Sequence, residues 1–425
     1  MTGDTIYALS SGALPAAIAI VRVSGPAAEV AAERLAGQLP EPRSASLRRL
    51  RAADGAIIDE ALLLRFPAPN TATGEPLVEL HLHGGRAVVA RLLDELSTMP
   101  GLREAEPGEF TRRALINSRL DLTQAEGLAD LLSAETEWQR RAAIESAGGA
   151  LRRQVEGWRD RLIALSARAE AAIDYVGDED ETALDEHALG AEAAIVAQEM
   201  RAWLVQPAAE LLTNGVKIVL AGPPNSGKSS LFNALVGAEK AIVTSIPGTT
   251  RDIIEARIDF DGLPANLLDT AGLRASDDTV EQIGVERAFD ALSQADIVLW
   301  LGNPEDAPVR SNVILIHSRA DERVDVPEGS IATSVRTSTG TAKLRSVLLA
   351  RLRALLPPFD QAALNRRQRH LLSEAADALT GAIGRDLLIV AESLRQSLAS
   401  VDVVLGRNST EEVMDALFGR FCLGK

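Results

Sequence analysis

The stretch that decides the fold is Gly222-Pro-Pro-Asn-Ser-Gly-Lys-Ser229, which follows an apolar run at 216–221 and precedes helical apolar spacing at 230–236. A strand, a glycine-rich turn and a helix in this order form a phosphate-binding loop. Glycines let successive backbone N–H groups curl around an anion, and the start of the helix adds the positive end of its dipole. We expect Lys228 to reach the terminal phosphates of a nucleotide and the Ser229 hydroxyl to bind Mg²⁺. A simple connecting turn is the alternative interpretation.

Two later segments follow in the order that a GTPase requires. Gly248-Thr-Thr-Arg-Asp252 predicts a first switch in which Thr250 binds Mg²⁺. Asp269-Thr-Ala-Gly272 follows an apolar run, so we expect Asp269 at a strand end, where it holds Mg²⁺ through water while the Gly272 N–H senses the γ-phosphate. Either segment alone is compatible with an ordinary loop. Their order after the phosphate-binding loop predicts a G domain.

The segment Ser318-Arg-Ala-Asp321 occupies the place of the guanine-specificity motif, Asn-Lys-x-Asp. Asp321 keeps the carboxylate that accepts from guanine N1–H and the exocyclic amine, a pairing that adenine does not offer. Arg319 is expected to stack its guanidinium plane on the purine. We expect the Ser318 side chain to be too short to tie this loop to the phosphate-binding loop. Because the later motif, usually Ser-Ala-x-Thr-Gly, is also blurred within 335–340, we predict guanine preference with weakened affinity.

Composition and charge exclude several classes of protein. The 425 residues allow two to four domains, and 46% hydrophobic with 24% charged residues is typical of globular proteins. No apolar run approaches the length of a membrane span and the start lacks a basic n-region, so we expect a cytoplasmic protein without a membrane segment. The single cysteine, Cys422, excludes an internal disulfide framework. A net charge of −16 argues against nucleic-acid binding by broad electrostatic attraction.

Two smaller patterns are interpreted as surface. His81 and His83 lie in an alternating run and are assigned to a strand surface rather than to a metal pair. Basic clusters at 48–51, 112–113, 140–141, 152–153 and 366–369 are interpreted as solvated helix faces.

The chain divides into four stretches. Residues 1–118 mix β-like runs at 18–23 and 77–82 with a helical segment near 87–96. Residues 119–212 have helical spacing, the G domain occupies 213–356, and 357–425 is helical again. Each helical block has an apolar stripe that needs a partner, so we predict a multidomain α/β plus α protein. It has an N-terminal α+β domain and one helical bundle split by an inserted P-loop (Ras-like) G domain.

Signatures outside the G domain point to one family. They are Asp4-Thr-Ile, Ile20-Val-Arg-Val-Ser-Gly25, Val78-Glu-Leu-His-Leu-His-Gly-Gly85, Pro107-Gly-Glu-Phe-Thr-Arg-Arg-Ala114, Leu120-Asp-Leu-Thr-Gln-Ala-Glu-Gly-Leu-Ala-Asp130 and Phe421-Cys-Leu-Gly-Lys425. Over its full length the chain resembles the tRNA modification GTPase family MnmE (TrmE). The resemblance implies a folate-binding N-terminal domain that forms a homodimer, and a flavin-containing partner of the MnmG (GidA) type. Together the partners add a carboxymethylaminomethyl-type group to C5 of the wobble uridine of certain tRNAs. The carbon comes from a 5-formyl- or methylene-tetrahydrofolate, and GTP hydrolysis drives the cycle.

By position, the resemblance implies folate contacts at Arg22, Glu79, Arg119 and Lys425. Arginine or lysine suits the folate glutamate tail, and a carboxylate suits the N–H groups of a pterin. Cys422 matches a tail cysteine with a functional role in the family. Two interpretations stay open: a nucleophile or acid/base near the folate, or a small buried residue in a docked tail.

The resemblance also implies hydrolysis activated by G-domain dimerisation and by K⁺, which neutralises charge along the phosphates. The K⁺ ligands would be Asn225, Thr244, Ile246 and Thr249, and Glu281 would orient water. Replacing K⁺ with Na⁺ is expected to slow GTP turnover. The GTP contacts predicted in all are Asn225, Ser226, Gly227, Lys228, Ser229, Ser230, Thr244, Ser245, Ile246, Pro247, Gly248, Thr249, Thr250, Asp269, Thr270, Ala271, Gly272, Ser318, Arg319 and Asp321.

Two other functions fit parts of the sequence. A regulatory GTPase that binds ribosomes or another assembly explains 213–356 but leaves the N-terminal signatures and the tail unexplained. A structural partner with decayed hydrolysis is disfavoured by the set Lys228, Thr250, Asp269 and Glu281.

Overall fold

The computed structural model describes residues 3–174, 186–241, 254–270, 290–323, 325–358, 362–382, 385–407, 411–419 and 421–425. The chain forms two compact units, and the first contains both ends of the sequence. This terminal unit comprises Met1–Ala129 and Asp402–Lys425, and the central unit comprises Asp130–Val401.

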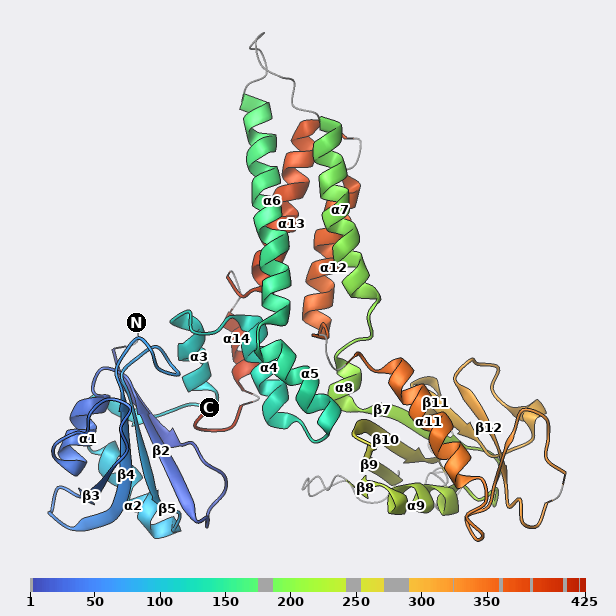
Figure 1. Cartoon of the computed structure of the whole chain (residues 1–425), viewed down its shortest axis with the longest axis horizontal. Coiled ribbons are helices and arrows are strands. Elements are labelled where there is room, and N and C mark those ends of the chain that lie inside the picture. Colours follow the sequence, from blue (N-terminus) through green and yellow to red (C-terminus); the bar gives the residue numbers. More distant parts are fainter. Residues whose placement is uncertain are drawn as a thin grey trace, which may run out of the picture. The chain divides into compact units, whose positions relative to one another are not determined.

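Within the described residues, the terminal unit is built on a six-stranded sheet with the strand order β3-β4-β5-β2-β1-β6 (Figure 1). Alternate residues of its strands are buried beneath α1 (Ala28–Ala36) and α2 (Arg86–Ser97) in one core. The strands predicted at 18–23 and 77–82 and the helix predicted near 87–96 are confirmed. The strands are β1 (Thr5–Leu9), β2 (Ile18–Ser24), β3 (Ser46–Arg51), β4 (Ile57–Phe66), β5 (Leu77–His83) and β6 (Leu102–Glu104).

The opposite face of this sheet is covered in part, notably over β1. There α3 (Glu109–Ile116) packs Phe110 against Ile6 and Ala8 of β1. Beside it, the start of α4 (Leu122–Ser133) shares an apolar cluster with α14 (Glu411–Phe418) and Phe421. The end of the chain is therefore part of the same unit as its beginning.

The central unit contains a second sheet with the order β13-β12-β11-β7-β10-β9-β8. Its strands β7 and β10 to β13 are parallel, and β9 runs antiparallel to β10. Helices α9 (Lys228–Ala238) and α11 (Thr341–Leu355) contribute to one core with the sheet. The strands are β7 (Val216–Ala221), β8 (Lys240–Ala241), β9 (Ile254–Phe260), β10 (Leu263–Asp269), β11 (Ile297–Trp300), β12 (Val313–Ser318) and β13 (Ile331–Thr333).

Helices from before and after this sheet pack together, which confirms a helical domain split by an inserted G domain and the multidomain α/β plus α class. Arg201 of α7 pairs with Asp377 of α12 at 2.9 Å, and Arg369 of α12 donates to the Leu204 carbonyl. Figure 1 shows the long helices side by side. The helices are α5 (Glu137–Ala147), α6 (Ala150–Asp174), α7 (Glu186–Val205), α8 (Glu210–Asn214), α12 (Arg366–Gly381) and α13 (Leu387–Val404).

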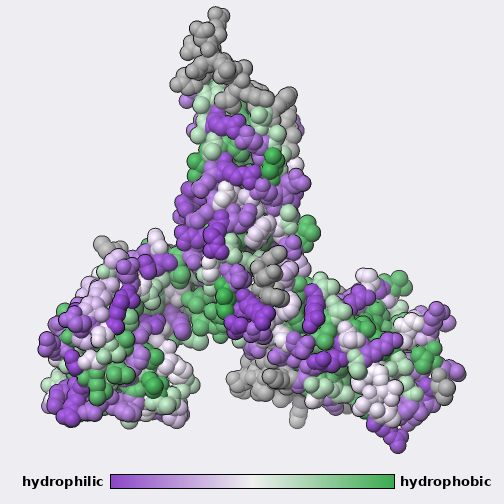
Figure 2. Space-filling model, viewed as in Figure 1, coloured by the Kyte–Doolittle hydropathy of each residue, from purple (hydrophilic) through white to green (hydrophobic). Residues whose placement is uncertain are grey.

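The interpretation of the basic clusters as solvated helix faces is wrong in two places. Arg48, Arg49 and Arg51 lie on strand β3, and Arg113 is only 3% exposed because it is enclosed by carboxylates. In the part of the chain that is described, no helix is both long and apolar enough to cross a membrane. Hydrophilic side chains are spread over the viewed face of the long helices (Figure 2).

Candidate functional site

The phosphate-binding loop connects β7 to α9 through backbone conformations that only glycine adopts easily. Gly222 has φ +144°, and a Cβ there would lie 3.0 Å from the Leu301 carbonyl carbon; Gly227 has φ +94°. Lys228 begins α9 and is buried, with Nζ donating to the carbonyl oxygens of Gly222 at 3.0 Å and Pro223 at 2.8 Å. The loop is thus curled around its own lysine, as an anion cradle requires.

Two elements beside this loop carry oxygen ligands of the kind that Mg²⁺ prefers. Asp269 is fully buried at the end of β10, where it pairs in register with Leu220 of β7. The Thr270 hydroxyl donates to the Leu220 carbonyl at 2.8 Å, which fixes the segment after Asp269. Ser229 lies in the first turn of α9. A carboxylate and a hydroxyl at this strand edge fit the ion, whose role would be to neutralise phosphate charge.

A cavity of about 300 Å³ lies where a base would follow the phosphates. It is lined by Gly227, Ser230, Ser318, Arg319, Asp321 and Ser334, among others. The pKa of Asp321 lies below its usual range because the Ser334 hydroxyl and its own N–H bond the carboxylate, with Arg336 and Arg319 nearby. An ionised carboxylate at this position accepts two donors from one purine edge.

The expectation that Ser318 is too short to reach the phosphate-binding loop is wrong. Its hydroxyl is buried and donates to the Ser226 carbonyl oxygen at 2.6 Å. Arg319, in the left-handed region with φ +56°, donates from Nη2 to the Asn225 carbonyl at 3.1 Å. The backbones of the two loops approach closely enough for a hydroxyl to span the gap, so both links exist despite the altered motif.

A second group of functional side chains lies on the open face of the terminal sheet. Arg22 of β2 and Glu79 of β5 are directly opposite each other, and Arg22 Nε and Nη2 donate to Glu79 Oε1 at 3.1 and 2.8 Å. His81 Nε2 lies 3.3 Å from Glu79 Oε2. The Arg22 and Glu79 side chains are each about one-fifth exposed. This pair offers a cation and a carboxylate to one ligand from rigid strands.

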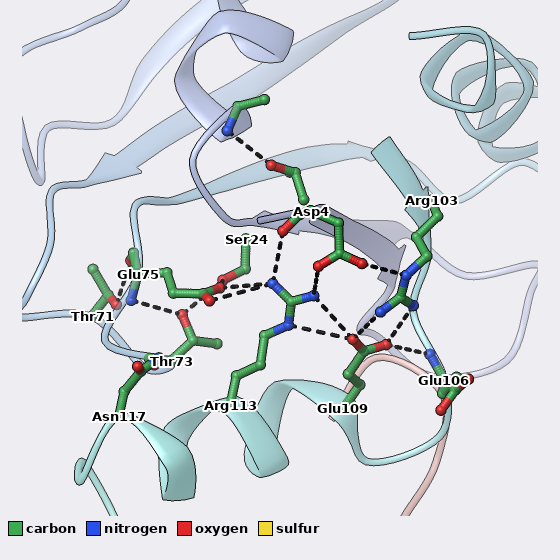
Figure 3. Close-up of polar contacts among 12 residues, drawn as sticks. Asp4, Ser24, Thr71, Thr73, Glu75, Arg103, Glu106, Glu109, Arg113 and Asn117 are labelled. Atoms are coloured by element: carbon green, nitrogen blue, oxygen red, sulfur yellow. Dashed lines mark hydrogen bonds and ion pairs between the residues drawn. The ribbon is translucent and has the colours of Figure 1, made fainter. Parts of the chain in front are cut away.

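Beside that pair, a buried ionic network holds α3 on the sheet (Figure 3). The Arg113 guanidinium donates to Asp4 Oδ1 at 2.9 Å, to Glu75 Oε2 at 3.1 Å and to Glu109 Oε1 at 3.0 Å. Arg103 Nη1 donates to Glu109 Oε2 at 2.8 Å. Burial raises the pKa of Glu109, but its hydrogen bonds from Arg103, the Glu106 N–H and Arg113 outweigh that effect and hold the pKa below its ordinary value.

The end of the chain docks against the same elements. The Phe110 N–H donates to the Lys425 main-chain oxygen at 3.2 Å. Gly424 has φ +88° and packs on the Leu9 carbonyl, where a Cβ would collide. Cys422 is exposed, which contradicts the interpretation of it as a small buried residue. Arg119 is also exposed, beside Gly74.

Family comparisons cover both units. A family model described as the MnmE helical domain matches residues 122–422, and one described as the GTP-binding protein TrmE N-terminus matches 5–119. The tRNA modification GTPase MnmE of Erythrobacter litoralis is 51% identical over 99% of this chain and 100% of its own length. The MnmE of Rhizorhabdus wittichii is 52% identical over 99% and 97%. The chain belongs to the family of the tRNA modification GTPase MnmE.

The G domain of the T. maritima FeoB iron transporter also resembles part of this MnmE family member. It is 28% identical, covers 32% of this chain and 98% of its own, and has a TM-score of 0.25.

Several predicted MnmE site residues lie outside the described residues. They are Thr244, Ser245, Ile246, Pro247, Gly248, Thr249, Thr250, Ala271, Gly272 and Glu281. Among the predicted K⁺ ligands, Asn225 lies within the described residues and has φ +57° in the phosphate-binding loop. The first switch, the Gly272 contact and the catalytic carboxylate therefore stay predictions.

Sequence reasoning missed one part of the base pocket. It placed the last motif within 335–340, whereas the cavity is lined by Thr333, Ser334, Val335 and Arg336. The available signal was the short apolar run ending at Thr333, since residues that follow a parallel strand lie at the ligand edge of the sheet.

Proposed function

We propose that this chain binds and hydrolyses GTP and, with a flavin-containing partner of the MnmG (GidA) type, modifies tRNA. The product would be a carboxymethylaminomethyl-type group on C5 of the wobble uridine, with a tetrahydrofolate derivative (5-formyl- or methylene-) as one-carbon donor. The relatives' name, tRNA modification GTPase MnmE, supports the coarser part of this proposal. A net charge of −16 gives the chain little electrostatic attraction to tRNA phosphates. The partner protein would therefore supply much of the affinity for tRNA.

The observation that carries the one-carbon part is the Arg22–Glu79 pair beside the returning tail. Glu79 has Leu64 opposite it on β4, and Arg22 has Ala8 opposite it on β1. A flat heterocycle with N–H donors would meet a carboxylate, a cation and apolar neighbours there. Arg22, Glu79, Arg119 and Lys425 are the proposed folate contacts, and exposed Cys422 stays close to them through the docked tail.

The nucleotide part follows from the loop and the base pocket. Lys228, Ser229 and Asp269 would act on the phosphates and Mg²⁺, and Asp321 would select guanine. We further propose activation by K⁺, bound by Asn225, Thr244, Ile246 and Thr249, with Glu281 orienting water. GTP turnover compared in K⁺ and Na⁺ tests this step. The domain boundaries at 118/119, 212/213 and 356/357 are part of the same proposal.

We propose a homodimer through the terminal sheet because its second face carries large apolar side chains that are exposed. Leu47 of β3 pairs with Leu62 of β4, and both are exposed, at 60% and 44%. Ile18 of β2 is 60% exposed and lies on the same face, since its neighbours Ala19 and Val21 belong to the covered core. Large apolar side chains gathered on one sheet face are typical of an interface.

Nucleoside analysis of tRNA tests the function directly. Cells that lack this chain should lose the modified wobble uridine, and the wild-type gene should restore it. A Lys228→Ala gene should not restore it, because the phosphate contact is lost. An Arg22→Ala gene should also fail while the purified variant still hydrolyses GTP. Unchanged wobble uridines in the deletion would remove the modification claim and leave a regulatory GTPase.

A further inference from the structure

Phe110 touches both halves of the proposed one-carbon site. Its ring lies beneath the Arg22 guanidinium, with Cζ 5.7 Å from the ring centroid. Its main-chain N–H donates to the Lys425 oxygen at 3.2 Å. Arg22 and Lys425 are far apart in the sequence, so these two contacts join a sheet residue to the tail through one position on α3.

The ring cannot shift freely. Phe110 is 3% exposed and packs with Ile6, Ala8 and Ala105. The residue before it, Glu109, accepts from Arg103 and from the Glu106 N–H, and Arg113 one turn later is held by Asp4 and Glu75. Figure 3 shows these side chains converging on α3 from separate segments. The network thus fixes the first turn of the helix that carries the ring.

The tail is constrained at the same place. Gly424 packs against the Leu9 carbonyl in a conformation with φ +88°. At the preceding turn, Gly108 has φ +72°, and a Cβ on it would lie 2.5 Å from the Phe418 carbonyl oxygen. The start of α3 therefore touches the returning chain at two points, Gly108 against Phe418 and the Phe110 N–H against Lys425, while Gly424 holds the tail on β1.

We infer that Phe110 is a positioning residue of this site, which orients Arg22 toward Glu79 with its ring and sets the place of the Cys422–Lys425 tail with its N–H. The inference rests on the proposed one-carbon function for the ligand, but its geometry does not. An arginine side chain has many rotamers, and one that is fixed by a ring before binding loses less entropy when the ligand arrives.

The test compares variants of the full chain for binding of 5-formyltetrahydrofolate by calorimetry. Phe110→Leu keeps an apolar side chain but removes the π face, and should raise Kd roughly five- to thirtyfold. Phe110→Tyr keeps the π face and should bind within about twofold of wild type, even if its buried hydroxyl lowers Tm. The matched control is Phe260→Leu, because Arg345 lies over this buried ring at 5.6 Å in the central unit, which carries none of the proposed folate contacts; its Kd should not change.

The second readout is the alkylation rate of Cys422, the only cysteine in the chain. Phe110→Leu keeps the N–H but unpacks the ring that fixes the first turn of α3 against Ile6 and Ala8. Without ligand it should therefore speed alkylation severalfold, while Phe260→Leu should not. If wild type binds folate and Phe110→Leu has the same Kd and the same alkylation rate as wild type, the inference is overturned. If wild type binds no folate, the one-carbon proposal fails, and the alkylation rates alone decide whether Phe110 places the tail.

Discussion

At the residue scale, the altered guanine motif shows that a link between two loops depends on backbone spacing as much as on side-chain length. Ser318 reaches the Ser226 carbonyl with a hydroxyl, where the usual motif has an asparagine. Arg319 adds a bond to the Asn225 carbonyl. The weakened affinity predicted from a missing link therefore loses its main physical reason.

Ser318→Ala should weaken GTP binding about tenfold. The substitution removes the hydrogen bond and leaves the carbonyl of Ser226, which is 5% exposed, without that donor, at a cost of about 1–3 kcal/mol. Titration with a fluorescent GDP analogue measures the change. Ser346→Ala is the matched control, because its exposed hydroxyl donates only within α11. Equal affinity in Ser318→Ala and wild type would show that the link does not support the site.

At the element scale, α3 is held by charge rather than by an apolar stripe alone. Burial would raise the pKa of Asp4, but hydrogen bonds and charge from Arg103 and Arg113 lower it overall, and Glu109 behaves in the same way. A carboxyl group whose folded pKa is depressed stabilises the fold fully above its unfolded pKa. That stabilisation is lost as the pH falls through the folded pKa.

The terminal unit should therefore lose stability in acid, below the ordinary glutamate pKa of 4.5. Glu109→Gln should cost about 3 kcal/mol at pH 7, because it leaves Arg103 and Arg113 short of a buried partner. The Tm of this variant should then change less than that of wild type between pH 5 and about pH 3. Glu411→Gln, from an exposed pair with Arg112, is the control and should follow wild type. Parallel pH profiles for Glu109→Gln and wild type would contradict the assigned role.

At the scale of the whole molecule, one sheet face is covered from within the chain and the other is not. Helices α1 and α2 bury one face of the terminal sheet, whereas Leu47, Leu62 and Ile18 stay exposed on the other. The tail and α3 cover the β1 side of that face. A second copy would bury the remainder, which is the reason for the proposed dimer.

Leu62→Asp should convert the dimer into a monomer. At a two-fold interface each subunit presents the same patch, so one substitution places two carboxylates in an apolar contact. We expect the dimer Kd to rise at least about a hundredfold, a cost of about 3 kcal/mol or more, with Tm nearly unchanged because Leu62 is 44% exposed. Sedimentation equilibrium measures the association. Leu388→Asp, at an exposed apolar residue of α13, is the control; dimers of Leu62→Asp as stable as those of the control would rule out this face.

The sequence by itself determined the parts of the protein that depend on neighbouring residues. The phosphate-binding loop, strands β7 and β10 and the split helical domain were predicted because periodicity and glycine spacing report local backbone and the buried face. Local signals did not identify Arg22 and Glu79 as site residues; the family resemblance did. They did not give their direct pairing across β2 and β5.

Tertiary structure decided which distant group each long or polar side chain meets. Arg113 was predicted on a solvated face and is buried among carboxylates from three segments; Ser318 was predicted to be too short and reaches its partner. Phe110 joins Arg22 to Lys425 across most of the chain length. Helical and strand periods fix the direction of a side chain from its own backbone. Which partner that side chain contacts depends on how closely loops approach and on where distant segments pack, and no local pattern contains this information.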